Sequence, residues 1–377
     1  MKRQLVPLLA AFMLGTAHLA IAGPFEDADA VYERGDHAAA VALWRPLAHA
    51  GDAKSQHALG MSYATGEGVA KDPVKALKWL QLAAAQGLAI AQSSLGDYYF
   101  RGDVPRNADE GVKWLRLAAD QHDARAQFLL ALSYRSGEAL PQDSAQAVKW
   151  FRLAASQGHK HAQFDLAGIL DRGEDFPQDL AEAFKWYMLA AEQGSEYAQH
   201  ALGVMYERGR GVPPDLAEAI VWYRRSAAQG YDSAQHSLGV LFEKGWGVPQ
   251  DFAEAARWYR LGAEQGEASA QNSLGAMFAT GRGVAQDYVE AIRWVRLAAV
   301  QGDPTAQSNL GAMYGNGQGV AVDDVRAYMW VELAALAGDA KAAAYRDALS
   351  RQMTPQRIHE AKNLARECQA GNFKRCD

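Results

Sequence analysis

Tryptophan recurs along this 377-residue chain at an interval of 35 or 36 residues. The periodic positions are Trp44, Trp79, Trp114, Trp150, Trp186, Trp222, Trp258, Trp294 and Trp330. A second marker, Ala-Gln followed by Leu-Gly or Leu-Ala, keeps the same step. A fixed period of this length is the signature of a repeat architecture. It predicts eight full repeats over 53–339, a partial repeat or cap over 23–52, and a C-terminal helical cap with a cysteine-containing tail over 340–377.

A single repeat, such as residues 232–267, predicts two helices. The first spans 233–243 and ends at Gly245, because glycine adopts the left-handed conformation that stops a helix. The second begins at Asp251, whose carboxylate can accept hydrogen bonds from backbone N–H groups. The expected buried stripes are Ala234, Leu238 and Phe242 on the first helix and Ala255, Trp258 and Ala263 on the second.

A small residue follows the leucine of each full repeat in the middle of its first helix. These residues are Gly60, Gly96, Ala131, Ala167, Gly203, Gly239, Gly275 and Gly311. Glycine weakens a helix, so its use there needs a packing reason. We expect it to let the two helices of a repeat approach closely, and we expect neighbouring repeats to stack and bury a continuous core.

The repeated motif resembles that of the Sel-1-like repeat family. It reads Ala-Gln-x-x-Leu-Gly-x-x-Tyr, a Gly-x-Gly-Val turn, and then Asp-x-x-x-Ala-x-x-Trp-x-x-x-Ala-Ala-x-Gln-Gly, with a close match over 199–230. The resemblance implies an all-α fold, a right-handed α/α superhelical solenoid of about eight to nine helix-turn-helix repeats related to tetratricopeptide arrays. Exported bacterial members of the family resemble adaptors, and the motif itself implies no chemistry.

The first 22 residues have the pattern of a secretory signal peptide. Lys2 and Arg3 precede an apolar stretch, and Ala20 and Ala22 place small residues where a signal peptidase reads. A membrane anchor is the alternative, although the apolar stretch is interrupted and barely long enough. Cleavage after Ala22 predicts a periplasmic or secreted protein. No later apolar run is long enough for membrane insertion.

The charge balance argues against nucleic acid as a partner. The formal net charge is -6, and removal of Lys2 and Arg3 would take it to about -8, opposite to the basic balance that phosphate binding favours.

The only two cysteines lie in the last ten residues. Cys368 and Cys376 would meet an oxidising compartment in an exported protein, and this favours a disulfide between them. Two thiols are too few for a closed zinc site.

A search for catalytic motifs predicts no enzyme, no cofactor and no metal site. Gly-x-Ser-x-Gly, His-Glu-x-x-His, Ser-x-x-Lys and nucleotide-binding loops do not occur. His159 and His161 have no third ligand near them in sequence. The rival interpretation is an envelope hydrolase or β-lactam-binding enzyme of the cysteine-rich Sel-1-like type, but those relatives carry cysteine pairs inside their repeats and this chain does not.

Binding residues are expected on the face of the first helix opposite its core stripe. Two positions in each repeat define this first-helix face: the residue after the motif glutamine and the residue after the Leu-Gly or Leu-Ala pair. The candidates there are Phe128, Leu132, Phe164, His200, Val204 and His236. Large apolar residues on such a face mark an interaction site, and tighter core packing is the alternative.

Trp246 is the one tryptophan outside the periodic series. It occupies a loop position that is polar in other repeats, so we expect it to be exposed and able to anchor a ligand. Packing over a neighbouring loop is the alternative. We therefore expect an exported scaffold that binds a protein or peptide partner, with an envelope polysaccharide or peptidoglycan as a second possible ligand.

Overall fold

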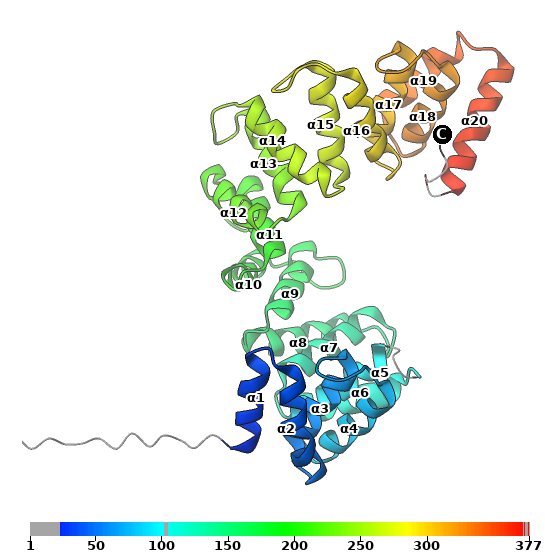
Figure 1. The fold of residues 1–377 in the computed structure, drawn as a ribbon. Coiled ribbons are helices and arrows are strands. Elements are labelled where there is room, and N and C mark those ends of the chain that lie inside the picture. The colour runs from blue at the N-terminus through cyan, green and yellow to red at the C-terminus, as the bar shows by residue number, and fades with distance from the viewer. Residues whose placement is uncertain (1–22, 102–104, 372, 374–375, 377) are drawn as a thin grey trace, which may run out of the picture. The chain divides into compact units, whose positions relative to one another are not determined.

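The computed structural model describes residues 23–101, 105–371, 373 and 376. The predicted signal peptide, residues 1–22, lies outside them. Every regular element in the described residues is an α-helix (Figure 1). None of these helices combines the length and the apolar character needed to span a membrane.

The chain forms two compact units, an N-terminal unit of residues 1–150 and a C-terminal unit of residues 151–377. The N-terminal unit contains α1 (Pro24–Glu33), α2 (His37–His49), α3 (Ala53–Thr65), α4 (Pro73–Ala85), α5 (Ala89–Arg101), α6 (Ala108–Asp120) and α7 (Ala124–Ser136). The division falls inside α8 (Ser144–Ser156).

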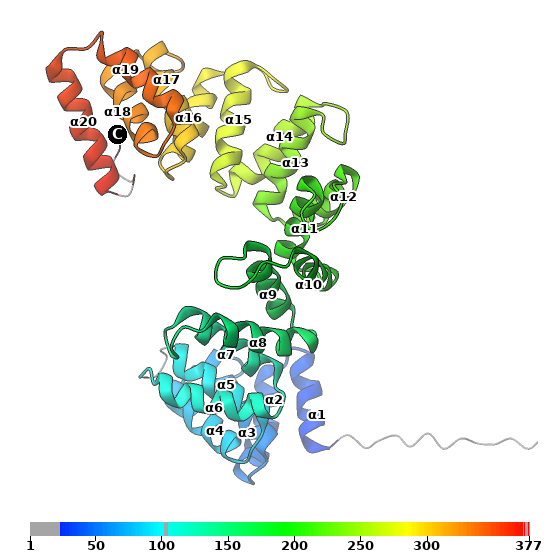
Figure 2. The ribbon, with the colours of Figure 1, turned by 180° about the vertical axis from the view of Figure 1, so that it is seen from behind.

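The C-terminal unit continues the series of helix pairs from α9 onward (Figure 2). Its helices are α9 (Lys160–Arg172), α10 (Leu180–Glu192), α11 (Glu196–Arg208), α12 (Leu216–Ala228), α13 (Asp232–Lys244), α14 (Phe252–Glu264), α15 (Ala268–Thr280), α16 (Tyr288–Ala299), α17 (Pro304–Asn316), α18 (Asp324–Leu336), α19 (Ala340–Ser350) and α20 (Pro355–Ala370).

The helix boundaries follow the local signals that the sequence carries. The helices expected in the 232–267 repeat are α13 and α14, and their observed bounds differ from the predicted ones by one residue. Asp251 caps α14 by accepting from the N–H of Glu254, and Gly245 ends α13 with a left-handed φ of 71°. Both devices satisfy backbone groups that a helix end leaves without a partner.

The buried stripe of the second helix differs from the prediction at one position. Trp258 is only half-buried, whereas Tyr259 after it is 1% exposed. Tyr259 lies against Gly239 of the same repeat, and a Cβ added to this glycine would lie 2.5 Å from the ring. Trp258 instead packs against the cluster that contains Leu238 and Ala234. The small residue after each leucine therefore makes room for the residue after the tryptophan.

The motif glutamines form a buried ladder that joins consecutive helices. Gln199 in α11 donates from Nε2 to the carbonyl of Ala191 at 3.1 Å, and its Oε1 accepts from Gln229 at 2.8 Å. The same two bonds occur around Gln56, Gln92, Gln163, Gln235 and Gln271. Each glutamine is a second donor to a carbonyl near the end of the preceding helix, which also accepts from the backbone N–H of the glycine three residues later. The ladder therefore connects each repeat to the one before it.

The C-terminal helices close the end of the stack. Cys368 of α20 and Cys376 form a disulfide. Both cysteines are buried in the cluster that contains Leu310 and Trp330. The disulfide therefore attaches the end of the chain to the core of the last repeat.

Candidate functional site

The first-helix face is more closely packed than its sequence pattern suggests. Phe128, Leu132, Phe164, His200, Val204 and His236 are all half-buried. His200 contacts the next first helix, where its Nε2 lies 3.3 Å from Oγ of Ser237. The same contact joins His57 to Ser94 at 3.0 Å and His236 to Ser273 at 3.4 Å. These polar bonds connect adjacent repeats along the face.

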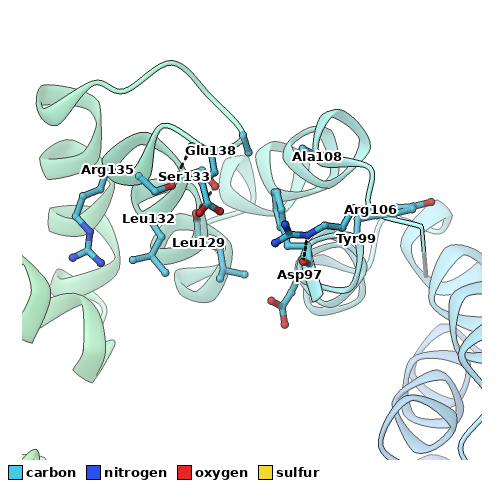
Figure 3. Close-up of a pocket in the computed structure, with 12 residues that line it drawn as sticks. Asp97, Tyr99, Arg106, Ala108, Leu129, Leu132, Ser133, Arg135 and Glu138 are labelled. Carbon is cyan, nitrogen blue, oxygen red and sulfur yellow. Dashed lines mark hydrogen bonds between the residues drawn. The ribbon is translucent and has the colours of Figure 1, made fainter. Parts of the chain in front are cut away.

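In the N-terminal unit this face is hollowed by a pocket of about 350 Å³. Figure 3 shows Leu129 and Leu132 of α7 on one side of the pocket, with Asp97 and Tyr99 of α5 on the other. Leu132 is one of the predicted binding residues. Phe128 does not line this pocket.

The pocket combines apolar walls with charges of both signs. Asp97 on the first-helix face accepts from Arg125 at 2.6 Å. Arg106 donates to the carbonyl of Phe100 at 3.0 Å and so is held at the rim. Arg135 and Glu138 add two further charged side chains to the lining. An apolar side chain with polar neighbours on both sides would match this arrangement.

In the C-terminal unit Phe164 and His200 of the first-helix face belong to a strip of ring side chains that includes residues of the second helices. We define this aromatic strip by Phe164, Tyr187, Tyr197, His200, Tyr223 and Tyr231. Consecutive ring centroids are 5.2 to 5.8 Å apart, within the range of favourable aromatic contacts. Tyr197 is 48% exposed, so the strip also meets solvent.

Phe164 packs against other side chains and is not freely exposed on the first-helix face. Its ring contacts Tyr187 and Tyr197, and it packs against the core cluster that contains Leu202. We therefore expect truncation of Phe164 to lower stability, which truncation of a fully exposed residue of the first-helix face would not do. Its role in binding stays a prediction.

Burial controls the protonation of the histidines on this face. Burial lowers the pKa of His57 to about 4, and it lowers the pKa of His200 to about 4 as well. The pKa of His236 is also lowered by burial. Ser237 donates its own hydroxyl proton to the carbonyl of Ser233, so Nε2 of His200 acts as the donor to Ser237. These histidines are therefore neutral near pH 7.

Trp246 is half exposed, with 50% of its surface open to solvent. It borders a shallow hollow together with Pro214 and Leu216 from the preceding repeat. Glu207 and Asp215 complete the hollow, and each already accepts a hydrogen bond, from Tyr223 and from the start of α12 respectively. Trp246 thus has a neighbouring loop on one side and solvent on the other.

Two features of the structure could not be predicted from the sequence. The motif glutamine was visible as a marker, yet nothing local indicates which carbonyl it contacts. The pocket in Figure 3 also escaped prediction as a whole, because it joins α5, α7 and the segment before α6. In the described part of the chain, no three His, Cys, Asp or Glu side chains converge as metal ligands would.

Comparison with known proteins agrees with the observed architecture. The Sel1 repeat model matches residues 53–88, 89–123, 124–159, 160–195, 196–231, 232–267, 268–303 and 304–339. A solved Sel1 repeat protein from Oxalobacter formigenes is 32% identical, with 86% of this chain and 93% of that chain covered and a TM-score of 0.64. The structure of c5321, a protective antigen present in uropathogenic Escherichia coli strains, is 28% identical, with 93% of this chain and 85% of that chain covered and a TM-score of 0.56.

The search of curated proteins gives no match. The eight family matches cover most of the chain, and they coincide with the stacked helix pairs of the structure. The chain therefore belongs to the Sel1 repeat family and is an all-α solenoid of the kind that typically mediates interactions between proteins.

Proposed function

We propose that the protein is an exported scaffold that holds a segment of a protein partner on its first-helix face. The observation that carries the proposal is the pocket in Figure 3, where Leu129 and Leu132 form an apolar wall beside charged side chains. A pocket of about 350 Å³ is large enough for one or two side chains of a peptide. Repeat scaffolds present such sites along a surface without any catalytic group.

Two features support export. The first 22 residues combine Lys2 and Arg3 with an apolar stretch and small residues before Gly23. The disulfide between Cys368 and Cys376 suits an oxidising compartment. N-terminal sequencing of the protein from fractionated cells should find Gly23 as the first residue outside the cytoplasm. An intact Met1 on a membrane-bound species would contradict export.

Peptide selection tests the binding proposal directly. Peptides of about 12 residues, selected by phage display against the purified protein, are labelled and titrated by fluorescence polarisation. Leu132→Glu should weaken binding at least tenfold, because it places a charge in an apolar pocket. The matched control is Val74→Glu on α4, where Val74 is 75% exposed and lines neither the Figure 3 pocket nor the other pockets described.

Circular dichroism first establishes that both variants fold as the wild type does. Equal binding by Leu132→Glu and wild type would contradict the assignment of the pocket. Failure to select any peptide would contradict the proposal that the protein holds peptide segments.

A further inference from the structure

A second pocket lies at the beginning of the N-terminal unit, where the partial repeat meets the first full repeat. Its volume is about 440 Å³. The large apolar side chains of the lining are Phe25, Tyr32, Trp44, Met61, Leu88 and Ile90. Met61 belongs to the first-helix face, as does His57 at the pocket wall. The pocket therefore opens on the surface to which the proposed function assigns partner binding.

The walls of this pocket are held in place by contacts among themselves. The rings of Tyr32 and Trp44 are 5.3 Å apart, and those of Phe25 and Trp44 are 6.4 Å apart. The hydroxyl of Tyr32 donates to Glu67 at 2.5 Å, which connects α1 to the loop after α3. Ile90, which also lines the pocket, is 50% exposed. The hollow is thus an ordered apolar surface that is partly open to water.

The charges around this hollow are predominantly negative. Three carboxylates line it, those of Asp29, Glu33 and Glu67, whereas Lys54 supplies one ammonium group. That ammonium is already paired with Glu26 at 3.0 Å. Helix α1 itself carries four carboxylates and no basic residue.

Lys54 also shows which chemistry the aromatic wall accepts. Its Nζ lies 5.3 Å from the centroid of the Phe25 ring. A cation at this distance from a ring face is attracted by the negative potential of the ring. Aromatic rings beside an excess of carboxylates favour a ligand that carries both an apolar side chain and a positive charge.

We propose that this pocket binds a partner segment in which an apolar side chain is flanked by lysine or arginine. The apolar side chain lies between Tyr32 and Ile90, and the flanking cations face Asp29 and Glu33. The inference rests on the proposed function, because it names the chemistry of the peptide that the scaffold holds. It differs from the proposed function in its site, which shares no residue with the pocket in Figure 3.

Two labelled peptides of equal length test the charge preference. The basic probe contains a leucine between lysine and arginine in a glycine-serine background, and the acidic probe replaces both cations by glutamate. In fluorescence polarisation the basic probe should bind at least tenfold more tightly. Its affinity should fall as salt is raised, since salt screens exposed charges. Equal affinity for the two probes would overturn the proposal.

Substitutions then locate the bound peptide. Ile90→Ser should weaken the basic probe at least fivefold, and the double variant Asp29→Asn with Glu33→Gln should weaken it similarly and remove most of the salt dependence. Val74→Ser on α4 is the control for Ile90→Ser, because it removes an exposed β-branched apolar side chain that does not line the pocket. This control should bind as the wild type does.

Leu132→Glu separates failure of this inference from failure of the proposed function. Loss of the basic probe in Leu132→Glu, with full binding retained in Ile90→Ser, would place the peptide in the pocket of Figure 3. That result would overturn the present inference and leave the proposed function standing. Absence of binding by the wild type would also overturn the inference, while the phage-selected peptides decide the proposed function independently.

Discussion

At the scale of single residues, the recurring glutamine is the most demanding position of the repeat. Gln199 is buried, and it both donates to Ala191 and accepts from Gln229. A hydrocarbon side chain of similar length could fill the same space but could make neither bond. The carbonyl of Ala191 would keep the backbone N–H of Gly194 at 3.0 Å but lose its side-chain donor, and Gln229 would lose its acceptor. Each lost hydrogen bond costs about 0.5–1.5 kcal/mol.

We expect Gln199→Leu to lower the free energy of unfolding by about 1–3 kcal/mol. In urea unfolding monitored by circular dichroism, the variant should have a lower midpoint than the wild type. Gln229→Leu is the control, since Gln229 is exposed and its loss leaves the bond from Gln199 to Ala191 in place. A larger loss for Gln229→Leu than for Gln199→Leu would show that the ladder does not act through the buried carbonyl.

The lowered pKa values of the buried histidines predict that the free energy of unfolding decreases in mild acid. The pKa of His200 in the folded protein is about 4 because of burial, below the value of about 6.5 in an unfolded chain. Between these values the unfolded state binds more protons, so stability falls as the pH decreases from 6.5 toward 4. One such histidine contributes at most about 1.4 kcal/mol per pH unit in this range.

His200→Asn should flatten this pH dependence while keeping the contact between repeats, because Asn272 occupies the equivalent position and accepts from Asn309 at 2.9 Å. Thermal melts at pH 7, 6 and 5 measure the effect. Parallel pH profiles for wild type and His200→Asn would contradict this assignment of the proton uptake.

At the scale of helices, close packing of the two helices within each repeat depends on a small residue opposite a large one. Gly203 of α11 faces Tyr223 of α12, and a Cβ at Gly203 would lie 2.5 Å from the ring. The ring is buried, and its hydroxyl donates to Glu207 at 2.6 Å. It therefore has little freedom to move away. The equivalent position in the α9–α10 pair is Ala167, which packs in one cluster with Tyr187.

Gly203→Ala should therefore destabilise the protein by about 1–3 kcal/mol through overpacking, although alanine is the better helix former by about 1 kcal/mol. Differential scanning calorimetry gives the sign of the change. Ala167→Gly is the matched reverse change, and it should cost about 1 kcal/mol from helix propensity alone. Stabilisation by Gly203→Ala would show that the two helices can separate without loss.

The helices were predictable because their signals are local. Asp251 and Gly245 act on neighbouring backbone groups, so their position along the chain was sufficient evidence. The depth of Trp258 and Tyr259 could not be judged in the same way, since it depends on which face of the second helix meets Gly239. Both pockets escaped prediction for a related reason. Their linings come from several helices, at positions that the repeat leaves free to vary.

At the scale of the whole molecule, the extensive helix–helix contacts follow the order of the chain. They join successive helices, or helices two apart such as α5 with α7 and α18 with α20. Stability in such an array is a sum of repeat terms and nearest-neighbour terms. A defect should therefore act mainly on the repeats around it.

Tryptophan substitutions at the two ends of the array test this locality. Trp44 is buried in the cluster of the partial repeat, and Trp330 is buried in the last repeat. Each change to alanine should cost about 3–5 kcal/mol where the side chain packs. In hydrogen exchange measured by mass spectrometry, Trp44→Ala should speed exchange in α1 to α3 and leave α15 to α20 unchanged, whereas Trp330→Ala should do the reverse. Faster exchange throughout the chain in either variant would mean that coupling between neighbouring repeats is strong enough for the array to open as one cooperative body.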